Sequence, residues 1–229
     1  MSIFSGITPP EVIFETSSKF NDNIKVLKSG DVLKLSVDNF VQSLSKNSKS
    51  APRLCWGEVV KILKEEEEKF QNILVLGMGG ATMQHFIREA YPEAHIVSVE
   101  IDPVMADIAR QYFDLGSIGN HDVIVEDAFR VVVEPETYGL QKQSFDAIIV
   151  DIVFGEGFPD LASSGNFLSA LQKLGVPGGL ILFNRMYLKQ HQDGVNLFKE
   201  LIENFFKDIQ TRIVAGYTNS DNILIYGRI

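Results

Sequence analysis

The chain has 229 residues, 45% of them hydrophobic, and is long enough to bury a core of ordinary domain size. Its 21 basic and 30 acidic residues give a formal net charge of −9, which argues against a surface that neutralises nucleic-acid phosphates. The lone cysteine, Cys55, excludes an internal disulfide, and no apolar run approaches the ~18 residues of a membrane span. We therefore expect a cytoplasmic protein with neither a nucleic-acid nor a membrane partner.

The first part of the chain predicts a small antiparallel β unit. Residues 11–43 contain the segments "EVIFET", "IKVLKS", "DVLKLSVD" and "NFVQS", which have partial apolar alternation and are separated by turn compositions such as "KFNDN". The next stretch, "SLSKNSKSAP" at 43–52, is polar and predicts a mobile linker. We therefore expect a small N-terminal β unit, residues 1–50, followed by one larger domain, residues 51–229.

The segment "RLCWGEVVKILKEEEEKF" predicts a helix that ends in an acidic run. Its apolar residues at 59, 62 and 63 lie on one helical face, and the charged residues follow them. Adjacent helix positions fan out around the axis, so we interpret the glutamates at 65–68 as a solvated surface and not as a metal site.

From residue 72 onward the pattern alternates between strands and helices. The helical segments are typified by "TMQHFIREAY", "PVMADIARQYF" and "GVNLFKELIENFF". Apolar β-rich runs lie at 73–76, 96–99, 123–125, 147–150, 180–183, 209–214 and 223–226. Only "YTNSDN" joins the last two runs, too short for a parallel crossover, so these strands are predicted to form an antiparallel hairpin. The prediction is a seven-stranded, doubly wound α/β sheet with an antiparallel last strand, the Rossmann-like arrangement of S-adenosylmethionine-dependent methyltransferases.

Glycine or an acidic residue follows each of the first four strands of the predicted sheet. The residues concerned are Gly77, Gly79 and Gly80 after the first strand, Glu100 after the second, Asp127 after the third and Asp151 after the fourth. Ligands bind at the carboxyl ends of such strands, glycines let a ligand approach the backbone, and a carboxylate accepts hydrogen bonds from ribose hydroxyls. The pattern predicts nucleoside binding. The alternative is that Glu100 and Asp127 only cap the helices that follow them.

The order of these segments resembles the spermidine synthase family. The segments are "VLGMGGA", "VSVEIDPVM", "VIVEDAFRVV", "FDAIIVDI" and "VPGGLIL". The resemblance implies transfer of an aminopropyl group from decarboxylated S-adenosylmethionine to a polyamine, and a dimer. It also implies that Glu100 holds the ribose, that Asp127 and Ala128 hold the adenine, and that Gln42 reaches over the nucleoside. Asp151 would be the first acid of the catalytic loop.

Three positions depart from what this resemblance implies. Gly80 stands where the family has an aspartate for the aminopropyl amine, Trp56 where it has a tyrosine, and Phe154 where it has a second catalytic acid. A polyamine carries several positive charges and needs carboxylates to offset its desolvation. We therefore expect S-adenosylmethionine or its decarboxylated form as cofactor and a small non-polyamine acceptor. A true aminopropyltransferase and a non-catalytic nucleoside-binding relative remain the alternatives.

The loss of the aspartate at position 80 also bears on the choice of cofactor. Without that charge, the backbone N–H groups of the glycine loop would face an anion at the start of the helix "TMQHFIREAY". This predicts that intact S-adenosylmethionine, which carries a carboxylate, binds at least as tightly as the decarboxylated form.

Other residues carry further expectations. Trp56 and Phe154 either form an aromatic wall for the acceptor or pack in the core. The segment 153–165 has the composition of a lid, in which Glu156 and Asp160 could replace the lost acid. The histidines lack the spacing of a zinc site, so no metal is expected, and only His191 merits a test as an acid or base.

Overall fold

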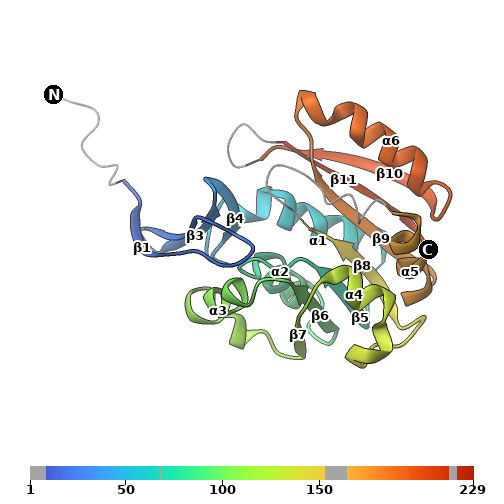
Figure 1. Cartoon of the computed structure of the whole chain (residues 1–229), viewed down its shortest axis with the longest axis horizontal. Coiled ribbons are helices and arrows are strands. Elements are labelled where there is room, and N and C mark those ends of the chain that lie inside the picture. Colours follow the sequence, from blue (N-terminus) through green and yellow to red (C-terminus); the bar gives the residue numbers. More distant parts are fainter. Residues whose placement is uncertain (1–8, 68, 153–163, 217–220) are drawn as a thin grey trace.

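The small N-terminal unit is an antiparallel sheet, as the sequence predicts. We describe a computed structural model of the chain, in residues 9–67, 69–152, 164–216 and 221–229. The sheet has the strand order β1-β2-β3-β4. Its strands are β1 (Glu11–Thr16), β2 (Ile24–Ser29), β3 (Val32–Val37) and β4 (Phe40–Leu44), and they lie at the left of Figure 1. Phe154, Glu156 and Asp160 lie outside the described residues.

The larger sheet has seven strands in the order β10-β11-β9-β8-β5-β6-β7. The strands are β5 (Asn72–Leu76), β6 (His95–Glu100), β7 (His121–Val125), β8 (Phe145–Val150), β9 (Gly175–Met186), β10 (Lys207–Val214) and β11 (Asn222–Arg228). β5 to β9 pair in parallel, whereas β11 runs antiparallel to both β9 and β10. The predicted α/β methyltransferase-like sheet with an antiparallel last strand is confirmed.

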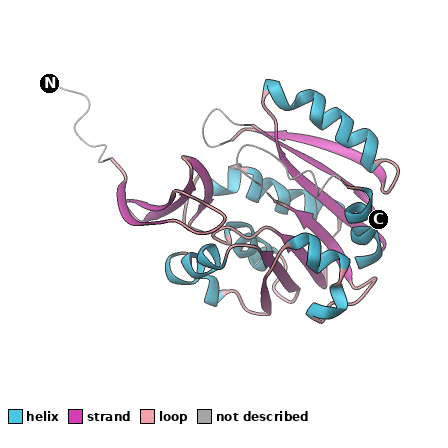
Figure 2. Ribbon diagram, in the orientation of Figure 1, coloured by secondary structure: helices cyan, strands magenta, loops and turns pink. Residues whose placement is uncertain are grey.

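Helices cover both faces of this sheet (Figure 2). The α-helices are α1 (Cys55–Glu66), α2 (Thr82–Ala90), α3 (Pro103–Tyr112), α4 (Ala128–Val133), α5 (Gly165–Leu174) and α6 (Gln192–Ile202). Successive side chains of a strand point to opposite faces. Ile73 and Val75 of β5 accordingly pack with α1, α2 and α3, while Leu74 and Leu76 pack with α4, α5 and α6. The carboxyl ends of the parallel strands are left for the connecting loops.

The small sheet rests on α3 of the larger unit (Figure 1). Ile24, Val26 and Leu35 are fully buried and share a hydrophobic cluster with Met105 and Ile108 of α3. This contact fixes β4 beside the loop that follows β5.

The polar stretch after β4 is not the mobile linker that its composition predicts. The Ser48 N–H donates to the Ser45 carbonyl (2.9 Å), and the Asn47 side chain donates to the Asp31 carbonyl (2.8 Å). A short 3-10 helix, η1 (Ala51–Arg53), then leads into α1. The stretch is a hydrogen-bonded turn that packs against the β2–β3 connection.

The acidic end of α1 lies on the surface, as the sequence predicts, with Glu65 and Glu67 exposed, and two of its glutamates also form ion pairs. Glu65 accepts a hydrogen bond from Arg212 of β10 at 2.5 Å, and Glu66 accepts one from Arg228 of β11 at 2.6 Å. These ion pairs join the end of α1 to the antiparallel strands of the large sheet.

Candidate functional site

The predicted site residues follow strands that lie side by side. The Gly77 N–H donates to the Val99 carbonyl (2.9 Å), and the Asp151 N–H donates to the Leu76 carbonyl (2.8 Å). The end of β5 is therefore bonded to the ends of both β6 and β8. The structure brings the glycine loop, Glu100 and Asp151 together at the carboxyl ends of three neighbouring strands, β5, β6 and β8. Ligands of such folds bind on this side of the sheet.

Two glycines of the loop have conformations and surroundings that require glycine. Gly77 has φ +92°, and a Cβ there would lie 2.1 Å from the Asp151 carbonyl oxygen. Gly79 has φ +54°, and a Cβ there would lie 3.0 Å from the Ser43 Oγ. Residues other than glycine seldom adopt such positive φ values. The backbone of the loop is thus packed directly against β8 and β4.

Glu100 is 9% exposed and is held by the glycine loop. One carboxylate oxygen accepts the N–H groups of Met78 (3.2 Å) and Gly79 (3.1 Å), and the other accepts the N–H of Asp102 (3.1 Å). Burial raises the pKa of Glu100, and these N–H groups oppose the rise. Glu100 is not a helix cap, because Asp102 caps α3 by accepting the Val104 N–H at 2.9 Å. The capping alternative is wrong for Glu100.

Asp127 does cap a helix. Its side chain accepts the Phe129 N–H at 2.8 Å at the start of α4, whose first residue is Ala128. A carboxylate retains acceptor capacity beyond one bond. The cap therefore agrees with the alternative interpretation of Asp127, while the adenine contact of Asp127 and Ala128 stays a prediction.

Residues of β4 close over the glycine loop. The Ser43 Oγ accepts the Gly80 N–H at 2.7 Å and donates to the Gln42 carbonyl at 2.6 Å. The Gln42 carbonyl lies 3.3 Å from the position that a Cβ on Gly79 would take. Gln42 is thus beside the loop, and its contact with a nucleoside remains a prediction.

The N–H groups of the glycine loop are already hydrogen-bonded within the protein. Those of Met78 and Gly79 bind Glu100, and that of Gly80 binds Ser43. The Ala81 N–H donates to the Met78 carbonyl (3.0 Å). In this conformation a buried glutamate and a serine hydroxyl satisfy the N–H groups of Met78, Gly79 and Gly80, and the expected preference for an anion stays a prediction.

Asp151 is the last member of a chain of polar side chains. Its Oδ1 accepts a hydrogen bond from the Asn184 Nδ2 (2.7 Å), and the Asn184 Oδ1 accepts one from the Asn222 Nδ2 (3.0 Å). Burial raises the pKa of Asp151 to about 6, and the bond from Asn184 opposes the rise. Burial, and secondarily the charge of Asp151, raise the pKa of the Cys55 thiol at the start of α1. Asp151 can therefore accept a proton near neutral pH.

The sequence prediction missed these partners of Asp151. Cys55 counted only as an unpaired thiol, and Asn184 and Asn222 did not stand out. A polar residue inside the apolar run "LILFNRM" was the available signal for Asn184. The role of Asn222 depends on the pairing of β9 with β11, which no local pattern gives.

The remaining candidates are structural in this conformation. Trp56 is 7% exposed and packs in the cluster that contains Val59 and Ile62, so its indole is in the core. The His191 Nδ1 accepts the Leu188 N–H at 3.3 Å, which is a local contact. Among the described residues there is no group of three or more histidine, cysteine, aspartate or glutamate side chains that could hold a metal ion.

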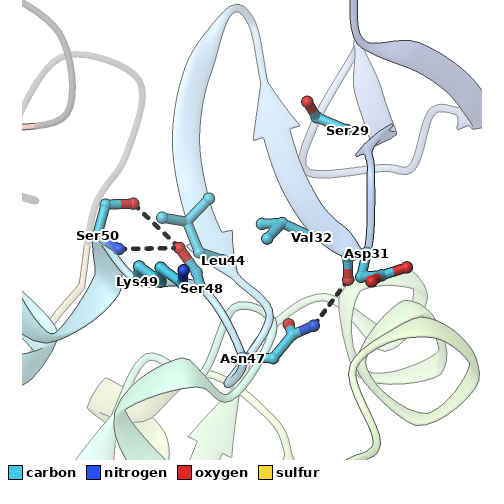
Figure 3. A pocket seen from close by; sticks show the side chains of 8 residues that line it. All are labelled: Ser29, Asp31, Val32, Leu44, Asn47, Ser48, Lys49 and Ser50. Atoms are coloured by element: carbon cyan, nitrogen blue, oxygen red, sulfur yellow. Dashed lines mark hydrogen bonds between the residues drawn. The ribbon is translucent and has the colours of Figure 1, made fainter.

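A separate pocket of about 530 Å³ lies away from the strand ends (Figure 3). It is formed by the β2–β3 connection and the turn after β4, where Asn47 and Asp31 are bonded (Figure 3). Its lining residues are Ser29, Asp31, Val32, Leu44, Asn47, Ser48, Lys49 and Ser50. None of the predicted site residues lines it, so we do not assign the nucleoside to it. Within the described ranges, no helix is long and apolar enough to cross a membrane.

Comparison with known proteins shows that parts of the chain are similar to two kinds of transferase. A polyamine aminopropyltransferase of Vibrio vulnificus (strain CMCP6) is 35% identical over 116 residues, which are 51% of this chain and 38% of that protein. The eEF1A lysine and N-terminal methyltransferase homolog of Drosophila melanogaster is 36% identical over 89 residues, which are 39% of this chain and 12% of that protein. The chain thus matches well under half the length of both relatives.

A solved structure and a family model both relate the chain to the spermidine synthases. The crystal structure of spermidine synthase from Thermotoga maritima aligns with a TM-score of 0.77 at 13% identity and covers 95% of this chain and 72% of that one, a likeness of fold. The model of the spermine/spermidine synthase domain matches residues 58–227. With its large sheet, glycine loop and strand-end carboxylates within that match, the chain belongs to the spermine/spermidine synthase family.

Proposed function

We propose that the protein is a transferase that binds S-adenosylmethionine or its decarboxylated form and passes a methyl or other group to a small, non-polyamine acceptor. The observation that carries the proposal is the row formed by Glu100, the glycine loop and Asp151 at one edge of the sheet. Glu100 and the glycine loop provide the polar groups for the nucleoside. The acceptor end has a single described carboxylate, Asp151.

The state of position 80 supports a changed acceptor. A Cβ on Gly80 would lie 2.8 Å from the Ser43 Cβ and 3.2 Å from the Phe113 ring. The family aspartate therefore has no room there in this conformation, and Trp56 is buried in the core. A multiply charged amine would find too few carboxylates to offset its desolvation.

The proposed reaction is an in-line displacement. When bound, S-adenosylmethionine or its decarboxylated form would supply an electrophilic carbon next to a positively charged sulfur. A nitrogen or oxygen of the acceptor would form the new bond to this carbon while the carbon–sulfur bond breaks and leaves its electron pair on the sulfur. Asp151 takes the proton that the acceptor loses, since its pKa of about 6 allows it to be ionised beforehand at neutral pH.

Calorimetry with S-adenosylmethionine, its decarboxylated form and methylthioadenosine tests the nucleoside half of the proposal. Glu100→Gln replaces an ionic acceptor and should weaken binding by about 1.5–3 kcal/mol. The control is Asp122→Asn on β7, whose side chain is 74% exposed, and it should bind like the wild type. Failure of all three ligands to bind would refute the proposal, and unchanged affinity in Glu100→Gln would remove Glu100 from the site.

A true aminopropyltransferase is the second candidate, because the family match and the Vibrio relative favour it. The discriminating assay offers putrescine together with decarboxylated S-adenosylmethionine. Our proposal expects turnover well below the ~1 s⁻¹ of ordinary enzymes. Turnover at or above that rate would establish the second candidate instead.

We keep three further expectations as proposals. The chain is divided into a unit of residues 1–50 and a domain of residues 51–229, it is cytoplasmic, and it forms a homodimer. Light scattering of the purified protein measures the mass directly, and a mass of about 25.6 kDa, that of one chain, would contradict the dimer.

A further inference from the structure

Three amide and carboxyl side chains form a directed chain at the carboxyl end of β9. The Asn222 Nδ2 donates to the Asn184 Oδ1 at 3.0 Å, and the Asn184 Nδ2 donates to the Asp151 Oδ1 at 2.7 Å. The three residues come from the start of β11, from β9 and from the end of β8. Asn184 is only 3% exposed.

The direction of this chain follows from the chemistry of its members. An ionised carboxylate only accepts hydrogen bonds, whereas an amide has one accepting and one donating end. Because an ionised Asp151 only accepts, the NH₂ group of Asn184 turns toward it, and the Asn184 oxygen is left to accept the NH₂ group of Asn222. A reversed Asn184 would place its oxygen against the carboxylate, and the Asn222 donor would face an NH₂ group. Asn222 thus satisfies the Asn184 oxygen and reinforces the orientation in which the Asn184 NH₂ group meets Asp151.

Packing alone does not explain a polar residue at position 184. Asn184 pairs with Leu224 of β11 in register, and the neighbouring residue on its face of β9, Leu182, belongs to the apolar cluster of α1, α2 and α3. A buried amide is unfavourable unless both of its ends are bonded. A leucine would fill such a position without that requirement.

Among the described residues around Asp151, the side chain that donates a hydrogen bond to its carboxylate is Asn184. The titratable neighbour on α1 is Cys55, whose thiol is kept neutral by burial. β5 presents only the backbone of Gly77. Arg185, the next residue of β9, turns to the other face, where its guanidinium lies 4.3 Å from the centre of the Phe198 ring on α6.

We propose that Asn184 and Asn222 are positioning residues that orient Asp151 and keep it ionised, so that the site accepts a nucleophile with an N–H or O–H proton to lose. This inference rests on the proposed transferase function. Asn222, at the start of β11, would thus contribute to acceptor specificity. An acceptor with no such proton, for example a tertiary amine, would not be activated by Asp151.

Titration of Asp151 by ¹³C NMR of labelled aspartate carboxyls tests the inference without a cofactor. The Asp151 signal is assigned by its absence in Asp151→Asn. Asn222→Ala and the bulkier Asn222→Leu both remove the donor to Asn184, and each should raise the midpoint of Asp151 by about one pH unit. Asn184→Ala removes the direct donor and should raise the midpoint at least as far.

The matched control is Tyr226→Phe on the same strand, which removes a hydroxyl that bonds to Gln210 (3.3 Å) and interacts with Arg212, and should leave the midpoint unchanged. Chemical-shift spectra of every variant establish that it is folded. An unchanged midpoint in a folded Asn222 variant, or in Asn184→Ala, overturns the inference. Because the titration needs no nucleoside, its result is independent of the calorimetry that tests the proposed function. Where transfer is measurable, Asn222→Ala should raise the apparent pKa of kcat and leave the KM for the nucleoside unchanged.

Discussion

Two carboxylates at the edge of the sheet, Glu100 and Asp151, are held by different kinds of donor. Glu100 is fixed by three backbone N–H groups, whereas Asp151 accepts the side chain of Asn184. Backbone donors move only with the loop, but a side-chain donor can rotate or be replaced. We therefore interpret Glu100 as part of the frame of the site and Asp151 as the group whose proton affinity its neighbours can tune.

The ionisation of Asp151 should be visible in the stability of the protein. Burial raises its pKa from the ordinary 3.8 to about 6, so the carboxyl favours folding while it is protonated and this contribution is lost as the pH rises through 6. Asp151→Asn, which stays neutral, should gain stability relative to the wild type between about pH 4 and about pH 8. The gain should be on the order of 2–3 kcal/mol. Urea unfolding of both proteins at the two pH values measures it, and a gain that does not depend on pH would show that Asp151 is not buried as a charge.

For single residues, the sequence predicts which side chains follow the strands. It does not predict which other residues of the protein form hydrogen bonds with them. Glu100 and Asp151 could be placed because the strand ends could be placed. The bond from Asn184 to Asp151 joins residues 33 positions apart, and the contact of Ser43 with Gly80 joins residues 37 apart. Such contacts depend on how the strands pair and how the small sheet docks, which local periodicity does not contain.

Among the elements, the loop between β5 and α2 is tightly constrained by its neighbours. Gly77→Ala combines a φ of +92° with a Cβ placed 2.1 Å from the Asp151 carbonyl, so the ends of β5 and β8 must separate. We expect a loss of about 3 kcal/mol in the free energy of unfolding. The control is Gly194→Ala in α6, where nothing lies within 4 Å of the added Cβ. It should gain up to ~1 kcal/mol, as alanine does in a helix. Equal effects in the two variants would contradict the close packing of the loop.

The contact between β4 and the glycine loop predicts coupling between Ser43 and Gly80. A Cβ at position 80 would lie 2.8 Å from the Ser43 Cβ, so Gly80→Ala should destabilise the wild type more than it destabilises Ser43→Gly. A double-mutant cycle by urea unfolding should give a coupling of about 1–2 kcal/mol. The same steric limit applies to an aspartate at position 80. Additivity of the two substitutions would show that the loop yields to a side chain.

The elements themselves are largely predictable, with one informative exception. The strands of the large sheet follow from apolar runs, because a parallel sheet buried on both faces needs continuous apolar strands. The stretch after β4 was expected to be mobile on account of its polar composition. Its serines and Asn47 instead satisfy backbone groups of the turn and of the β2–β3 connection, a use of polar residues that composition alone does not distinguish from solvation.

In the whole molecule, Asp102 joins the two sheets. It is fully buried, caps α3, and accepts the Ser18 hydroxyl (2.5 Å) and the Asn21 side chain (2.6 Å) from the β1–β2 connection. Its own N–H donates to Glu100 (3.1 Å). The β1–β2 connection of the small sheet is therefore bonded to Asp102, which also donates to Glu100, the residue proposed to bind the ribose.

Asp102→Ala tests this connection. The substitution removes a helix cap and leaves Ser18 and Asn21 without their acceptor, so we expect a loss of about 3 kcal/mol in the free energy of unfolding and weaker nucleoside binding. The control is Asp107→Ala on the same helix, where the carboxylate pairs with Arg110 and its side chain is 75% exposed. That variant should differ from the wild type by less than about 1 kcal/mol. Similar losses in both would show that Asp102 acts only as a surface charge.

The docking of the small sheet has a consequence for how a ligand could enter. β2 and β3 touch α3 through one apolar cluster, while Ser43 and Ser18 bond to residues on either side of Glu100. A local opening of the sheet would release both bonds at once and uncover the loop. We expect the amide hydrogen of Gly80, which is bonded to the Ser43 Oγ, to report this opening, and a ligand present at 100 times its Kd to slow its exchange by up to about a hundredfold. Exchange that is unaffected by a bound nucleoside would mean that the ligand enters with the sheet still closed, and access would then depend on the other side of the loop.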